Sequence, residues 1–374
     1  MPEAGQLLRC RPEFLRSGIV QRSGSAGGYG RWCGDEREVE VGKVPVDVYL
    51  LVLGDHLPDP RTGLAVSEAE RIRAVVEQAV LAEEAGFTGV AIGEHHFTRY
   101  IVSAPELVLA TIAARTNTLR LSTGVTLLAH RDPVLVAEEL ATLDVLSGGR
   151  AELIVARGVS QETDAAFGVG PDDLRARFEE NLRLLLRLLE EPEVTWRGTF
   201  RGPLVRVTTT PRPVQVPRPT VWIGSGSAVS ADLAVELGLP LMLPSTLRDP
   251  VSHREVVQRY RAGGPPGGRV ALPSHVFVAP SSAQARQQWR PHLAAYASFA
   301  QPWRGDGTQP DVDRLMEGAA VCGDPTEVAS RLNGLATLLG LDAHLVIVDI
   351  GGLAQPDVLA TIGLFGKEVI PLLQ

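Results

Sequence analysis

The chain has 374 residues, of which 44% are hydrophobic and 21% charged, so it can build a large buried core. A formal net charge of -8 argues against a nucleic-acid-binding protein, which would carry a basic face, and against a polybasic membrane anchor. No apolar run reaches the roughly 18 residues of a bilayer-spanning helix. The segment 1–29 also lacks the apolar centre of a secretory signal. We therefore expect a cytoplasmic protein.

Residues 1–43 differ from the rest of the chain. They are rich in Gly, Ser and Arg and have no sustained apolar period, so we expect a disordered arm or an upstream start-codon artefact. A regulatory or partner-binding arm is the alternative. Cys10, Cys33 and Cys322 match neither a zinc module nor a disulfide framework, which predicts reduced thiols and no metal site. Residues 44–374 are expected to form one domain.

From residue 46 onward, short apolar runs alternate with helical patterns. Strands are predicted at 48–53, 89–92, 119–128, 150–156, 221–224, 240–243, 270–278 and 344–349. Helices are predicted at 67–85, 105–114, 133–146, 172–189, 229–237, 250–262, 283–296, 325–339 and 356–373. This alternation predicts a (β/α)8 TIM barrel. An open doubly wound sheet is the competing fold, but the first strand–helix turn has no G-x-G-x-x-G.

Two segments interrupt the alternation. Residues 190–219, between the helix after strand 4 and strand 5, hold several prolines and predict an insertion over one end of the barrel. Within it, 194–200 and 205–209 are expected to pair as a hairpin. The polar stretch 301–310 is expected to be mobile.

Chemistry in such barrels lies at the carboxyl ends of the strands. Glu94, His95 and His96 follow strand 2, where an acid with two histidines predicts a proton-transfer site or a metal site. Adjacent histidines in extended chain point opposite ways, and no second ligand cluster has metal spacing, so we favour proton transfer. The alternative is one core histidine and one surface histidine.

A second candidate site follows strands 4 and 5. The turn Gly224–Ser230 leads from a strand into a helix, whose amino terminus and hydroxyl groups suit a phosphate. Arg157, at the end of strand 4, could bind the same phosphate with its guanidinium fork. Taken alone, the turn could be an ordinary strand–helix connection, and Arg157 could form a structural salt bridge. Together they favour a phosphate-bearing cofactor.

An ordered series of motifs resembles the luciferase-like flavin-dependent monooxygenase family. In chain order they are Gly86-Phe87, Gly93-Glu94-His95-His96-Phe97, Leu143-Asp144-Val145-Leu146-Ser147-Gly148-Gly149-Arg150, Arg157-Gly158, Phe167-Gly168, the turn Gly224–Ser230, Leu237-Gly238-Leu239-Pro240, and Leu364-Phe365 with Val369-Ile370-Pro371. The third of these is a form of the family's L-D-x-L-S-x-G-R. The resemblance covers residues 46–372.

The resemblance implies FMN at the strand ends. The residues implied to hold its phosphate are Arg157, Ser227, Ser230 and the backbone of Gly226, and those implied to lie against its isoalloxazine ring are Glu94, Thr123, Gly124, Val125 and Thr126. A non-prolyl cis peptide bond is implied at Gly124-Val125. His95 would be the active-site histidine and His96 its supporting histidine.

The implied reaction is a monooxygenation. A separate reductase would supply reduced FMN, which reacts with O2 to give a C4a-hydroperoxide in a water-poor pocket. His95, expected to have a pKa near neutrality, would move the proton, and one oxygen atom would pass to a carbonyl, amine or sulfur centre of a small organic substrate. Ala156 and Gly226 replace a reactive cysteine and a glutamate of the light-emitting subunit, so light emission is not expected.

Two alternatives stay open. One is an oxidoreductase of the same fold that transfers hydride with the deazaflavin F420, and the other is a non-catalytic flavin-binding or subunit-partner protein. The resemblance also implies a homodimer packed through helices 104–116 and 133–146. The substrate pocket is expected to be formed by loops 54–66, 96–104, 190–219 and 301–318. The sequence does not identify the substrate.

Overall fold

The computed structural model describes residues 46–244, 247–304 and 310–374, with the side chains of 303 and 304 left aside. The expected amino-terminal arm, residues 1–43, lies outside the described residues, as does the part of the expected mobile stretch from 305 to 309.

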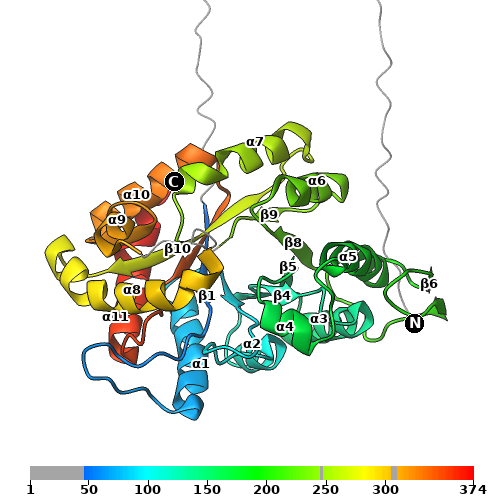
Figure 1. Ribbon diagram of the computed structural model, residues 1–374, viewed down its shortest axis with the longest axis horizontal. Coiled ribbons are helices and arrows are strands. Elements are labelled where there is room, and N and C mark those ends of the chain that lie inside the picture. Colours follow the sequence, from blue (N-terminus) through cyan, green and yellow to red (C-terminus); the bar gives the residue numbers. More distant parts are fainter. Residues whose placement is uncertain (1–45, 245–246, 305–309) are drawn as a thin grey trace, which may run out of the picture. The chain divides into compact units, whose positions relative to one another are not determined.

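Eight parallel strands close into a barrel (Figure 1). In chain order they are β1 (Asp47–Val52), β2 (Gly89–Ile92), β3 (Arg120–Thr123), β5 (Ala151–Ala156), β8 (Thr220–Gly224), β9 (Leu241–Met242), β10 (Val270–Val278) and β12 (Ala343–Ile347). Each strand pairs with the next in this order, and β12 pairs with β1. The predicted (β/α)8 barrel is therefore confirmed, and the open sheet is excluded.

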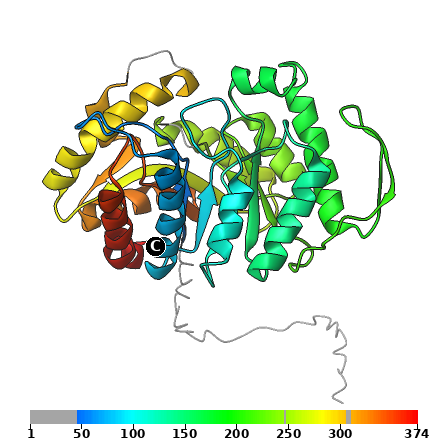
Figure 2. The ribbon, with the colours of Figure 1, turned by 90° about the horizontal axis from the view of Figure 1, so that it is seen from below.

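Helices surround the strands (Figure 2). They are α1 (Glu68–Glu84), α2 (Pro105–Ala113), α3 (Pro133–Ser147), α4 (Gln161–Ala166), α5 (Leu174–Glu190), α6 (Ala228–Glu236), α7 (Arg254–Gly263), α8 (Ser282–Arg304), α9 (Val312–Glu317), α10 (Pro325–Leu339) and α11 (Gln355–Leu364). Short 3-10 turns cover Pro250–His253 and Ile370–Leu372, and a π-helical turn covers Phe365–Val369. Because the helices cover the outer face of the sheet and side chains fill the inner one, the strands are nearly continuous apolar runs.

Helix ends follow local chemistry. Ser67 and Glu70 form a capping box at the start of α1, in which each side chain accepts a hydrogen bond from the backbone of the other. Asp132 caps α3 by accepting from the Val134 N–H at 2.8 Å, and Gly148 ends α3 in the left-handed conformation with φ 67°. These caps explain why the sequence located α1 and α3 well.

Two short strands and two helices, α4 and α9, were not predicted as such. β11 (Ala320–Gly323) pairs with the second half of β10, because β10 has nine residues and β9 reaches only Val270 and Ala271. β4 (Thr126–Leu127) continues the predicted third strand after a break and pairs with β5. α4 lies between β5 and α5. A four-residue buried strand such as β11 gives no periodicity that would separate it from a helix.

The L-D-x-L-S-x-G-R motif holds the barrel together. The buried Asp144 carboxylate accepts from the N–H groups of Val214 and Gln215, at 2.7 and 2.9 Å, and from the Gln215 side chain at 2.7 Å. Arg150 donates to four backbone carbonyl groups at the ends of α2 and α3 and in the segment between α2 and β3, including Ala113 at 3.0 Å and Ser147 at 2.9 Å. This motif therefore fixes α2, α3 and β5 relative to one another.

Charged side chains pair at the amino-terminal end of the barrel. Glu152 accepts from the Tyr49 hydroxyl at 3.1 Å and pairs with Arg120 at 2.7 Å. Asp47 pairs with Arg269 beside them. Burial raises the pKa values of Glu152 and Tyr49, and the arginines act against the Glu152 shift. These groups satisfy one another, so the opposite end is where a ligand would be expected to enter.

The insertion at 190–219 lies outside the ring of helices. It contains the expected hairpin, β6 (Val194–Trp196) with β7 (Leu204–Val207), at the outer edge of the fold (Figure 1). Its second half binds Asp144 near the start of β5. Its hairpin also reaches the start of α3, where Arg201 pairs with Asp132 at 3.3 Å. The expectation that the insertion lines the substrate pocket stays a prediction.

Candidate functional site

Glu94 follows β2 and is almost fully buried, with 3% of its side chain exposed. One carboxylate oxygen lies 3.0 Å from His96 Nε2, and the other accepts from the Leu127 N–H at 2.9 Å. Glu94 thus orients the supporting histidine and fixes the loop after β3. Glu94 and His96, both predicted from the sequence, thus form a hydrogen bond, and the Glu94 carboxylate is used by contacts within the protein.

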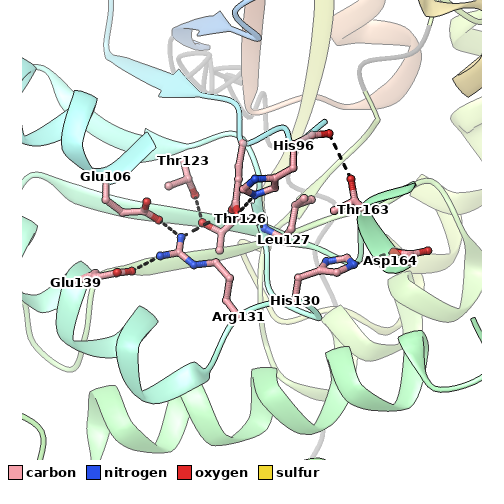
Figure 3. Close-up of polar contacts among 11 residues, drawn as sticks. His96, Glu106, Thr123, Thr126, Leu127, His130, Arg131, Glu139, Thr163 and Asp164 are labelled. Atoms are coloured by element: carbon pink, nitrogen blue, oxygen red, sulfur yellow. Dashed lines mark hydrogen bonds and ion pairs between the residues drawn. The ribbon is translucent and has the colours of Figure 1, made fainter. Parts of the chain in front are cut away.

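Arg131 extends this network. Its guanidinium lies 3.8 Å from the Glu94 carboxylate and donates short hydrogen bonds to Glu106 of α2 and Glu139 of α3 (Figure 3). Burial raises the pKa of Glu139, and Arg131 lowers it in part. One arginine therefore holds three carboxylates from three elements. No sequence motif indicates this group, because its carboxylates lie 8 to 37 residues from Arg131.

A second histidine–carboxylate pair lies beside the first. His130 Nε2 is 2.7 Å from the Asp164 carboxylate, and 1% of the His130 side chain is exposed (Figure 3). The rings of His96 and His130 both contact Phe167, edge to face, with centroids 4.9 and 5.8 Å away. His130 Nδ1 is buried and makes no hydrogen bond within the described residues. Sequence reasoning missed Asp164 because α4 was not predicted.

His95 lies on the other side of the β2 loop. Its ring stacks on Tyr100 with centroids 3.9 Å apart, and the Tyr100 hydroxyl is 3.1 Å from that of Tyr296 in α8. Burial, together with the neighbouring His96, lowers the pKa of His95 to about 4, and a backbone hydrogen bond at Leu53 acts the other way. The expected pKa near neutrality is therefore wrong. At neutral pH the ring is uncharged, and its low pKa makes it a weak base.

The segment after β3 combines a fixed turn with buried hydroxyl groups. The Gly124-Val125 peptide bond is cis, as the family resemblance implies. Thr126 donates to the Thr123 hydroxyl at 3.0 Å, and Thr123 donates to the Ile154 carbonyl at 3.2 Å. A Cβ on Gly124 would meet other side chains of the barrel at 2.8 and 2.9 Å. Only glycine lets the backbone pass this close to the barrel interior.

The turn after β8 is a group of hydroxyls at a helix start. Ser227 caps α6 by accepting from the Ser230 N–H, and it donates to the Ser230 hydroxyl at 3.0 Å. Ser225 Oγ lies 3.3 Å from Ser227 Oγ. A Cβ on Gly226 would lie 3.0 Å from Pro244. Three hydroxyls and the positive end of a helix are a suitable environment for a phosphate.

Arg157 lies beside this turn by strand register. Val155 of β5 pairs with Ile223 of β8, so Arg157 and Ser225 follow at the same level of adjacent strand ends. The Arg157 side chain is half-buried, and no hydrogen bond or ion pair involves it within the described residues. A half-buried guanidinium without a protein partner fits a site for an anionic group. Arg157 thus forms no structural salt bridge with any residue that the structure describes.

An open pocket of about 590 Å³ adjoins the histidines. It is lined by residues of two of the predicted loops, 54–66 and 96–104, and by the start of α1, with His95, His96 and Arg99 among its walls. Two of the four loops expected around the substrate therefore meet beside His95.

Neither a metal cluster nor a membrane helix is found in the described parts of the chain. No group of three or more His, Cys, Asp or Glu side chains there could hold a metal ion. No helix in the same residues is both long enough and apolar enough to span a bilayer.

Comparison with known proteins gives one family. The sequence profile of the luciferase-like monooxygenases matches residues 49–342. The protein y4vJ of Sinorhizobium fredii is 36% identical over 44% of this chain, and the matched stretch spans 47% of that relative. N-acetyl-S-alkylcysteine monooxygenase of Bacillus subtilis is 27% identical over 71% of this chain and 78% of its own length.

Two further proteins are similar, one compared by sequence and one by structure. The oxygenase component of flavin-dependent trigonelline monooxygenase from Acinetobacter baylyi is 26% identical over 44% of this chain and 46% of its own. The crystal structure of the monooxygenase RslO1 from Streptomyces bottropensis superposes with a TM-score of 0.77 at 27% identity, over 87% of this chain and 99% of that one.

Proposed function

Because the chain belongs to the luciferase-like monooxygenase family, we propose that it is a flavin-dependent monooxygenase that uses reduced FMN and O2 to oxygenate a small organic substrate. The observation that carries the proposal is the half-buried, unpaired Arg157 beside the serine turn, on the same barrel end as His95. One end of the barrel thus offers an anion site and a neutral imidazole together.

The residues of this barrel end fit the cofactor. Arg157, Ser227 and Ser230, with the Gly226 backbone, would hold the phosphate, and the segment from Thr123 through Gly124 to Val125 would face the ring. FMN, when bound in reduced form, supplies the electrons that activate O2. The buried unpaired nitrogen of His95 is one polar group of the protein that a ligand here could satisfy.

The chain's own residues would control protons and water. His95 is neutral at pH 7 and a weak base, so it would orient the substrate by a hydrogen bond. His96 is held by Glu94 and packs on Phe167, so it would keep the site ordered and water-poor. We infer that His95 is the catalytic residue and His96 the supporting one.

The direct test is cofactor-dependent oxygen uptake. The purified protein with FMN, NADH and a generic flavin reductase should consume O2 in a substrate-dependent way. His95→Ala should lower substrate turnover about 100-fold or more while FMN binding stays unchanged. Normal turnover in this variant would refute the catalytic role. A protein that binds FMN but shows no turnover with any candidate substrate would favour the non-catalytic alternative.

A titration with both cofactors in parallel distinguishes FMN from F420. We propose FMN rather than F420 because two histidines follow Glu94, whereas F420 members of the family more often carry a single histidine after an acid. Anaerobic titration with reduced FMN and reduced F420 should show tighter binding of FMN. Tighter binding of F420, with hydride transfer in the absence of O2, would establish the alternative.

A partner reductase follows from the chemistry. The relative named as an oxygenase component implies a separate protein that supplies reduced flavin, and we propose the same arrangement here. Its contact with this chain would be transient.

A homodimer is proposed from exposed apolar side chains. Leu107 of α2 is 73% exposed, and Leu135 and Leu146 of α3 are 57% and 64% exposed. These helices are the ones that the family resemblance implies in dimer contact. Leu107→Glu should shift sedimentation toward the monomer, and unchanged sedimentation of a dimer would place the interface elsewhere.

The substrate class is open to a direct trial. N-acetyl-S-methylcysteine is a reasonable first compound because one relative is named for N-acetyl-S-alkylcysteines. Substrate-dependent O2 uptake and a sulfoxide or cleavage product would identify a sulfur centre as the oxygen acceptor.

A further inference from the structure

A short antiparallel ladder forms one wall of the pocket beside His95. Asp55 bridges Tyr100, the His56 N–H donates to the Arg99 carbonyl at 2.7 Å, and the Ile101 N–H donates to Gly54 at 2.8 Å. In this pattern residue 56 stands directly opposite residue 99. Side chains of opposite residues lie on the same face of a ladder, with Cβ atoms about 5 Å apart.

The two faces of the ladder carry different side chains. On its buried face are Asp55, which accepts from the Gly351 N–H at 2.9 Å, and Tyr100, which stacks on His95. On the other face are His56 and Arg99, and both line the pocket. Alternation along the two extended segments therefore places both basic side chains on the face opposite Tyr100, and the pocket that they line also reaches His95.

The basic face is not neutralised by the protein. No ion pair or side-chain hydrogen bond involves Arg99 within the described residues. The His56 ring donates from Nε2 to the Val66 carbonyl at 2.6 Å, which orients the ring and leaves its other nitrogen available. Glu68, in the first turn of α1, is the acidic residue among those lining the pocket, and no ion pair joins it to Arg99.

We propose that this pocket binds the carboxylate of the substrate through Arg99, with His56 as a second contact, so that the enzyme oxygenates small carboxylic acids. The inference rests on the proposed function and adds the substrate class to it. A guanidinium presents two parallel donors that match a carboxylate, and His95 lines the same pocket. A volume of about 590 Å³ suits such a ligand.

Binding of matched acid and amide probes tests the proposal. Phenylacetate and N-acetylmethionine are each compared with their primary amides by isothermal titration calorimetry on the FMN-loaded protein. Each acid should bind about ten-fold or more tighter than its amide, because only the acid can form charged bonds to a guanidinium. Arg99→Gln should abolish this preference. Glu68→Gln should strengthen binding of the acids.

A matched control removes the same charge outside the pocket. Arg73 is exposed on α1 and lines the neighbouring groove, so Arg73→Gln should keep the acid preference. Equal or absent binding of acids and amides in the wild type, or the same result for Arg99→Gln and Arg73→Gln, would overturn the proposal.

FMN affinity and reductase-driven O2 uptake are measured on the same variants. Arg99→Gln should leave FMN affinity unchanged, so a protein that binds FMN and consumes O2 yet ignores carboxylates would refute the substrate class alone. Loss of FMN binding in the wild type would instead refute the proposed function.

Discussion

Replacing Arg157 by methionine isolates the phosphate contact. Methionine keeps much of the apolar stem and removes the guanidinium, which makes no hydrogen bond or ion pair within the described residues. The folded protein therefore loses no internal hydrogen bond or ion pair, and the melting temperature should change little. A charge-assisted hydrogen bond contributes about 1.5–3 kcal/mol, which corresponds to an increase of about 10- to 150-fold in the Kd for FMN.

The assay compares FMN with riboflavin, which lacks the phosphate. Flavin fluorescence titrations on wild type and Arg157→Met give four dissociation constants. The variant should weaken FMN binding and leave riboflavin binding nearly unchanged, and Arg157→Lys should show an intermediate FMN affinity because it keeps charge without the fork. Equal losses for both flavins would mean that Arg157 shapes the site without touching phosphate. An unchanged Kd for FMN would remove Arg157 from the site.

Two predictions concern stability. Asp144→Asn should lower the free energy of unfolding by about 2–5 kcal/mol, because a buried carboxylate that accepts from three N–H donors at 2.7–2.9 Å is replaced by an amide that cannot satisfy all of them. The exposed Asp172→Asn should change it by less than about 0.5 kcal/mol in the same urea titration, and similar losses in both variants would contradict the motif's structural role. Acid should destabilise the wild type through His275, because burial holds its folded-state pKa near 3 while the unfolded chain takes up the proton below about 6.5. Stability present above pH 6.5 is thus lost as pH falls toward 3, by up to about 1.4 kcal/mol per pH unit, and His275→Leu should flatten the unfolding free energy measured against pH over this range. A parallel slope in the variant would exclude His275 as the cause.

Local patterns located most elements. The alternation of apolar runs with capped helical segments predicted the eight barrel strands, because strand and helix periods are properties of neighbouring residues. The hairpin of the insertion was also predicted. β11 was missed because its four buried residues make sense only beside β10, which lies more than 40 residues earlier in the chain.

The site was predicted in part. The resemblance named Glu94, His95, His96, Arg157 and the serine turn, and the fold brings them to one end of the barrel. It did not reveal that Asp164 pairs with His130, or that Arg131 pairs with Glu106 and Glu139. These partners come from α4, α2 and α3, which are separate elements. Their roles depend on contacts between elements rather than on spacing.

The sequence by itself determined the barrel and the family, since both follow from the order of short local patterns. Only the tertiary structure decided the charge state of His95, because the pKa depends on how much water the surrounding elements exclude. The tertiary structure alone also joined the second half of the insertion to Asp144 and placed Arg99 opposite His56. Solvent exclusion and pairing across the fold involve residues far apart in the chain, and no local pattern encodes them.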